Sequence, residues 1–479
     1  MSLALAVFLC FATGFLLVRT LWPIKTTFPD GLFLQLSLSA NCGLGVFSVS
    51  YFLSRLLGIV HPIRIDLAVF ALVLGTFLLR AKSRQTFSPV DQRGEDDPRW
   101  LQVLFWVGFI VAAGAGFYAS LMRAFAHPHG DGWDAFAIWN LHARFLFLGG
   151  EHWRDGFSAL IPWSHPDYPL LLPGAVAHFW SFLGVDTVAV PSVIGLLFTF
   201  STIALLVSSI SILRGRAFGL LAGITLAATP AFIEVGSWQY ADIPLAFFFL
   251  AVIALLCLHG EASPDSTSAS SGLLVLSGLC LGFGAWTKNE GMLFCCAIIM
   301  ARMLIPLNRR LRRQSEGEKA ISLVPVLLAA APLLILVICF KRMIAFPNEI
   351  FSAPGIMEQK ILSGTRYWAI IQWFVREFFR GGHWLLVPAT VLMAASYCFL
   401  RSKNPPTLTV RICRGAILLM IAGYFLIYVI TPYDLYWHLR FSLDRLFLQL
   451  WPSAIFLFFA ALRPLKTERF ASSMKEANR

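Results

Sequence analysis

Two aspartates three positions apart, Asp131 and Asp134, are the residues best suited to chemistry in this chain. They belong to the segment Asp-Gly-Trp-Asp-Ala-Phe-Ala-Ile-Trp, which ends at Trp139. A carboxylate within hydrogen-bond reach of a hydroxyl can act as a general base. The polar stretch 124–167 around them follows an apolar run and carries several histidines, including His165. This grouping suggests a site, although a solvated acidic loop explains the two aspartates alone equally well.

Other connectors between apolar runs contain acidic, basic and aromatic residues that could join the same site. They contribute Tyr240, Asp242, Lys288, Trp437, Arg440 and Arg445. Charged groups close to hydrocarbon are costly and usually mark function or pairing. Lysine and arginine at an interface can bind anionic groups.

Each of these residues also has a purely structural explanation. Asp242 could begin a helix, where an acid favours the positive end of the helix dipole. Lys288 could extend its ammonium to the membrane interface, and Trp437 could be an interfacial anchor. The histidines lack the spacing of paired zinc ligands on a helix, so a zinc site is not expected.

The composition places the chain in a membrane. Of its 479 residues, 58% are hydrophobic and 13% are charged, and the mean hydropathy is +0.72. A soluble protein of this size could not bury so much apolar surface. Runs of roughly 20 apolar residues can cross ~30 Å of hydrocarbon as helices. We therefore predict an all-α, polytopic membrane protein with about 13 transmembrane helices. A long loop on the outer face is predicted to carry interfacial helices. The spans are predicted near 2–22, 32–57, 63–80, 100–124, 188–213, 217–233, 242–259, 271–287, 290–306, 321–344, 383–400, 410–431 and 443–463.

The placement of the basic residues predicts which loops face the cytoplasm. The net charge is +12, but the lysines and arginines crowd into short loops such as 81–99 and 307–320 and into the tail. This is the positive-inside bias of membrane proteins. A nucleic-acid partner would need one continuous basic face, which is not visible. The stretch 124–167 then faces outward, provided that 168–184 forms a helix at the outer interface and does not cross. We expect a multi-pass protein of the inner (plasma) membrane.

The chain reads as one membrane domain with three parts. These are an N-terminal three-helix segment with a cytoplasmic loop over 1–99, a core over 100–345 with the outer loop 124–187, and C-terminal helices over 346–479 with outer loops 345–382 and 431–442.

Four motifs give the chain a resemblance to a known class of enzymes. They are Gly132-Trp-Asp-Ala-Phe-Ala-Ile-Trp, His165-Pro-Asp-Tyr-Pro, Tyr240-Ala-Asp-Ile-Pro and Gly282-Phe-Gly-Ala-Trp-Thr-Lys-Asn-Glu-Gly. These motifs share an order, a spacing and a predicted position on the outer side of the membrane. In these respects the chain resembles the GT-C class of integral-membrane glycosyltransferases, especially protein O-mannosyltransferases and lipid A aminoarabinose transferases. The resemblance covers about residues 100–306; the first three spans do not match the single helix usual before the acidic loop.

The resemblance implies a polyprenyl-phosphate sugar donor, an inverting displacement at the anomeric carbon, and a glycan, lipid or protein acceptor. Asp134 is then the first choice for the general base and Asp131 the second. The donor-binding candidates are Asp242, Lys288, Arg440, Arg445, Trp139, His165, Tyr240 and Trp437. Asp242 could also help to hold a divalent cation, Mg²⁺ or Mn²⁺, because these ions prefer oxygen ligands.

Two other functions fit the same residues. A transporter or flippase of a lipid-linked or polar substrate is one alternative, although such proteins tend to show internal repeats and charges at the membrane midplane. A lipid-linked sugar ligase or polymerase would use the same donor and site chemistry. A membrane scaffold without activity would have no reason to gather acids and bases at one face.

Overall fold

The computed structural model describes residues 3–23, 30–59, 61–81, 99–261, 270–311, 321–346, 360–380 and 406–462. These parts of the chain are almost entirely helical and contain no strand. The all-α prediction is therefore confirmed.

Seven described helices are long and apolar enough to cross a membrane. They are α1 (Leu3–Leu21), α2 (Asp30–Leu56), α4 (Arg99–Ala126, apolar from Gln102), α7 (Ala189–Arg214), α10 (Asp242–Gly260), α13 (Val324–Met343) and α17 (Leu408–Ile430). The chain is thus a polytopic membrane protein, but the predicted number of about 13 spans is not confirmed.

The remaining predicted spans differ from this group in length, in charge or in shape. The helix α11 (Ser271–Thr287) is shorter, and α3 (Ile63–Ala81) and α18 (Leu435–Phe459) carry several charged residues. The helix α12 (Asn289–Leu311) covers the predicted span 290–306. The predicted span 383–400 lies outside the described residues.

The span predicted over 217–233 is not one straight helix. It consists of α8 (Arg216–Ala227) and α9 (Pro230–Ser237), which are bent by 64° at their junction. Pro230 is the first residue of α9, and Thr229 before it is extended. A residue before proline avoids the helical conformation, and proline suits the first turn of a new helix. The pair counts as an eighth span if it crosses the membrane as a unit.

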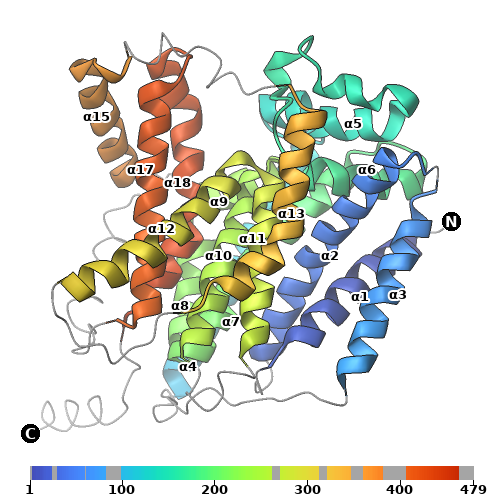
Figure 1. Cartoon of the computed structure of the whole chain (residues 1–479). Helices are drawn as coiled ribbons and strands as arrows, with labels where there is room; N and C mark the ends of the chain where they lie inside the picture. The colour runs from blue at the N-terminus through green and yellow to red at the C-terminus, as the bar shows by residue number, and fades with distance from the viewer. Residues whose placement is uncertain are drawn as a thin grey trace, which may run out of the picture.

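The helix α10 forms the centre of the bundle, between α7, α11 and α18 (Figure 1). All its residues from Asp242 to Leu258 are buried. A helix that is apolar on every side is expected at the core of a large helical assembly. Its first residue, Asp242, is therefore a carboxylate placed at the end of the most deeply buried helix.

The N-terminal helices pack against this core through α2. Figure 1 shows α1 and α3 beside α2, which also contacts α6 and α7. Small residues allow α1 and α2 to approach closely: a Cβ at Gly14 would lie 1.9 Å from the carbonyl oxygen of Ser39. Close packing of small residues is typical of helix pairs in membranes.

The predicted outer loop is itself helical. After α4 the chain forms a π-helical turn, η1 (Ala135–Trp139), then α5 (Asn140–Leu148), the 3₁₀ segments η2 (Gly150–Phe157) and η3 (Pro162–Ser164), and α6 (Leu171–Leu183). With 13 residues, α6 spans only ~20 Å and cannot cross the hydrocarbon. Its residues from Leu171 to Trp180 are all buried, so it is inserted against α2 and α5 rather than lying on the surface. Further along the chain, α15 (Gly364–Arg380) lies beside α17 and α18 within the predicted loop 345–382.

Candidate active site

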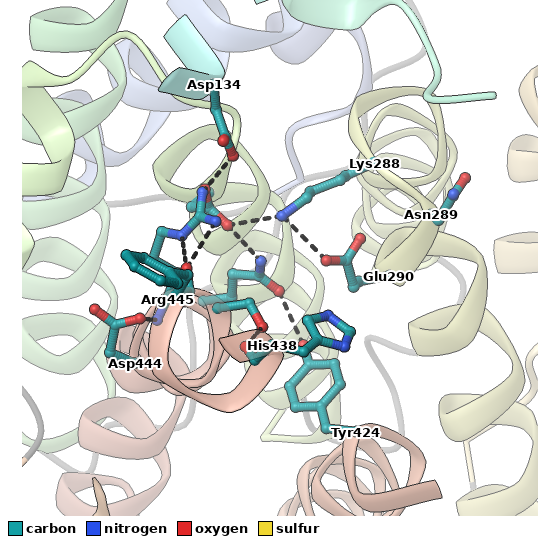
Figure 2. A network of polar contacts seen from close by, with 12 residues as sticks. Asp134, Lys288, Asn289, Glu290, Tyr424, His438, Asp444 and Arg445 are labelled. Atoms are coloured by element: carbon teal, nitrogen blue, oxygen red, sulfur yellow. Dashed lines mark hydrogen bonds and ion pairs between the residues drawn. The ribbon is translucent and has the colours of Figure 1, made fainter. Parts of the chain in front are cut away.

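Four of the predicted site residues converge at the end of the bundle that carries the helical loop (Figure 2). Asp134 precedes η1, Asp242 begins α10 and Lys288 follows α11. Arg445 lies about three turns into α18. The carboxylate of Asp134 accepts a 2.5 Å hydrogen bond from Arg445 Nη1, across 311 positions of sequence. These residues therefore form one site built from four separate parts of the chain.

The carboxylate of Asp242 is the centre of the network. Its Oδ1 accepts hydrogen bonds from Lys288 Nζ at 2.9 Å and from Gln449 Nε2 at 2.6 Å. Its Oδ2 lies 3.7 Å from Arg445 Nη1. The side chain is only 1% exposed, and a buried carboxylate is strongly unfavourable without such partners. Asp242 thus fixes two cations next to each other.

The ammonium of Lys288 is held between two carboxylates. Besides Asp242 it pairs with Glu290 Oε1 at 3.1 Å, and it lies 5.9 Å from the centre of the Tyr168 ring. Extended backbone at Lys288 separates α11 from α12 and directs the side chain inward. Burial alone would lower the pKa of Lys288, but the two carboxylates outweigh burial and raise that pKa above its ordinary value. Lys288 therefore keeps its positive charge.

The guanidinium of Arg445 connects the buried part of the site to its accessible edge. It stands 5.1 Å from the centre of the Tyr240 ring, a cation–π distance. The side chains of Arg445 and Asp134 are 15% and 21% exposed. Burial raises the pKa of Tyr240, with a further contribution from Asp134, so its hydroxyl stays protonated. A ligand approaching from outside would meet the Asp134–Arg445 pair first.

Two glycines shape the turn that presents Asp134. Gly130 and Gly132 both have a φ of +84°, a region that favours glycine. A Cβ at Gly132 would lie 2.5 Å from the hydroxyl of Tyr240. The Gly-Asp-Gly sequence before Trp133 is thus required for the close approach of this turn to the start of α10.

A layer of stacked aromatic rings packs against the network beside Lys288. The rings of Trp139 and Tyr168 are stacked at 5.4 Å, and those of His165 and Tyr168 at 4.8 Å. Trp139 is 1% exposed, so it reaches the site through Tyr168 and does not present a free ring face. Tyr168 in turn contacts a charged residue of the network, Lys288.

The structure places three other predicted residues apart from the network. Asp131 pairs with Arg123 at 3.4 Å. Arg440 lies over the ring of its neighbour Phe441, at 5.6 Å. Trp437 is exposed and packs on the same phenylalanine at 5.7 Å.

Several residues of the network carry no sequence signal that would single them out. Gln449 lies one helical turn after Arg445 on α18, and Tyr424 of α17 donates a 2.9 Å hydrogen bond to its Oε1. A second cluster adjoins Lys288: Asn289 donates to Asp167 at 2.7 Å and accepts from Lys341 at 2.6 Å. This cluster joins the helical loop to α12 and α13.

The residues present do not fit a divalent cation at Asp242. Both of its carboxylate oxygens face cationic or amide groups, of Lys288, Gln449 and Arg445. Oxygen ligands from several residues are what Mg²⁺ and Mn²⁺ require. Within the described ranges, no group of three or more His, Cys, Asp or Glu side chains could hold a metal ion.

Comparisons with models of protein families, with curated protein sequences and with solved structures found no match.

Proposed function

We propose that this protein is a membrane glycosyltransferase that moves a sugar from a polyprenyl-phosphate donor to an acceptor hydroxyl. The observation that supports the proposal lies at one end of an apolar bundle: a carboxylate, Asp134, pairs with Arg445, and the buried Asp242 holds Lys288 beside that arginine. Such a site offers both a base and a phosphate clamp, which are the two groups that this reaction needs.

The reaction divides between these groups as follows. The acceptor hydroxyl attacks the anomeric carbon while the bond from that carbon to the phosphate oxygen breaks. The hydroxyl proton passes to Asp134, and the leaving polyprenyl phosphate takes the electron pair. Arg445 and Lys288 stabilise the negative charge that grows on this phosphate. The acceptor is a glycan, a lipid or a protein.

The site faces the periplasm or the exterior in this proposal. The placement of basic residues supports this orientation. The site lies at one end of the helices, and the loops rich in lysine and arginine connect these helices at their other end. A lipid-linked donor could enter from the bilayer beside α18, and the acceptor from the aqueous side.

The transporter alternative has less support from the geometry. Asp134, Asp242 and Lys288 lie where helices begin or end, whereas transporters usually bind their substrate near the midplane. The ligase or polymerase alternative differs only in the acceptor and uses the same displacement at the anomeric carbon.

Purified protein mixed with polyprenyl-phosphate sugars tests the proposal through release of the free lipid phosphate. We expect release in the presence of an acceptor by the native protein and not by Asp134→Asn. Asp131→Asn is the matched control, because it changes a carboxylate of the same turn that pairs outside the network. Transport of the intact donor into sealed vesicles, without release of lipid phosphate, would contradict the proposal.

A further inference from the structure

A cavity of about 370 Å³ lies on the other side of the helical loop. Its walls come from the end of α2, the start of α3, and from α5 and α6. None of these four helices contributes a charged residue to the candidate active site. The volume is within the ~300–1,000 Å³ typical of small-ligand sites.

Arg55, in the last turn of α2, gives this cavity a positive charge. Its Nη2 donates to the carbonyl oxygen of Gly150, but its Nε is buried without a hydrogen-bond partner. Across the described ranges, no carboxylate pairs with Arg55, whereas Arg144 on the neighbouring α5 pairs with Asp186 at 2.9 Å. Arginine is always protonated in proteins, and a partly buried cation of this kind favours an anion.

The rest of the cavity is aromatic with an imidazole at its edge. Tyr51, Phe147 and Phe182 line it, and the exposed His61 stands at the rim. A basic group at the end of a helix could also simply extend to the interface. That explanation leaves the aromatic lining of the cavity without a role.

Two apolar residues next in sequence to the segments that line the cavity are open to the surroundings. Leu57, just after α2, is 67% exposed, and Leu183, at the end of α6, is 36% exposed. Apolar surface beside a cationic pocket matches a molecule with a charged head and hydrocarbon chains.

We infer that this cavity is a second binding site that takes a phosphate group, with Arg55 and His61 as its cationic and hydrogen-bonding ligands. The phosphate belongs to the headgroup of a membrane lipid or is free in solution. Arg55 also contacts Gly150, at the start of η2, so occupancy of the cavity would brace the helical loop from the side opposite to Asp134. The inference does not depend on the proposed transferase activity.

Binding to the purified full-length protein in detergent tests this inference. The probes are phosphatidylglycerol, diacylglycerol with the same acyl chains, and inorganic phosphate, each titrated and read by native mass spectrometry. We expect phosphatidylglycerol to bind more tightly than diacylglycerol. Arg55→Gln should weaken that binding by about tenfold or more, as expected for the loss of charge-assisted hydrogen bonds.

The matched control is Arg64→Gln, which removes an exposed arginine near the start of α3 that does not line the cavity. It should leave binding unchanged. Arg55→Lys, which keeps the charge, should retain part of the binding, and His61→Gln tests the site without changing α2. If inorganic phosphate binds only when Arg55 is present, and the two lipids bind equally well, then free phosphate is the ligand. Equal affinity for phosphatidylglycerol and diacylglycerol together with no Arg55-dependent binding of phosphate overturns the inference.

Discussion

Replacing Lys288 by methionine tests the arrangement of the site most directly. Methionine preserves the length of an apolar side chain and removes the ammonium. A lysine that only extended to the membrane interface would lose little stability on this change. In the structure, however, Lys288 is 8% exposed and pairs with Asp242 and Glu290, so its loss leaves a buried carboxylate without its main cation.

The expected cost follows from the burial and the remaining partners. Removal of one partner of a buried ion pair destabilises a protein by ~3–5 kcal/mol. Asp242 would keep Gln449 and Arg445, so we expect the lower end of this range, ~3 kcal/mol. Changing Asp242 to asparagine in the same chain removes the stranded charge. The loss in free energy of unfolding in the double variant should therefore be ~1–3 kcal/mol smaller than the sum of the losses in the two single variants.

Unfolding in mixed micelles, followed by tryptophan fluorescence, measures these differences. Arg440→Met is the control, because Arg440 is exposed at the same end of the protein and lies apart from the network; it should change the free energy of unfolding by less than ~0.5 kcal/mol. Additive effects of Lys288→Met and Asp242→Asn would refute the pairing on which the site is built. Unchanged donor affinity and turnover in Lys288→Met would separately refute its role as phosphate clamp.

Four further results are expected. Asp134→Asn should lower turnover by ~10²-fold or more while donor binding persists, because an amide cannot accept the proton; turnover near the native rate would move the base to Asp131 or exclude the enzyme. Arg445→Lys should retain part of the donor affinity and Arg445→Gln little of it, measured by donor titration. Gly132→Ala should lower the melting temperature and the activity together, because its Cβ meets the Tyr240 hydroxyl at 2.5 Å in a backbone region that disfavours alanine. A cysteine at His152 should react with a membrane-impermeant thiol reagent from outside the cell; reaction only from the cytoplasm would refute the proposed orientation.

Much of the chemistry of the site could be predicted from charge against an apolar background. Asp134, Asp242, Lys288 and Arg445 stand out because a charged residue at the end of a membrane helix is costly unless it is paired or functional. The sequence alone does not say which of several such residues meet. Arg440 lies only five positions before Arg445, yet it points elsewhere on α18, because a step of five residues rotates the side chain about 140° past a full helical turn.

Other features depend on tertiary packing that leaves no local pattern. Gln449 and Tyr424 are single polar residues within long apolar helices, and only the approach of α18 to α10 and α17 gives them partners. Trp139 looks like an interfacial aromatic in sequence, but the π-helical turn of η1 places it in the core. The break between α8 and α9 has a local signal in Pro230, whereas the angle of 64° follows from the contacts of each half.

In the proposed transferase, the balance of charge at the site would link donor binding to the release of the Asp134 carboxylate from Arg445. The network joins two cations, Lys288 and Arg445, to three carboxylates, those of Asp134, Asp242 and Glu290. A phosphate therefore cannot simply add to the site, because every cation already has an anionic partner. Asp242 is the least accessible carboxylate, at 1% exposure, and Asp134 is the most accessible, at 21%. A donor phosphate that approaches from outside would compete with Asp134 for Arg445. Its binding would leave the Asp134 carboxylate free beside the donor, which is where the acceptor hydroxyl must deliver its proton.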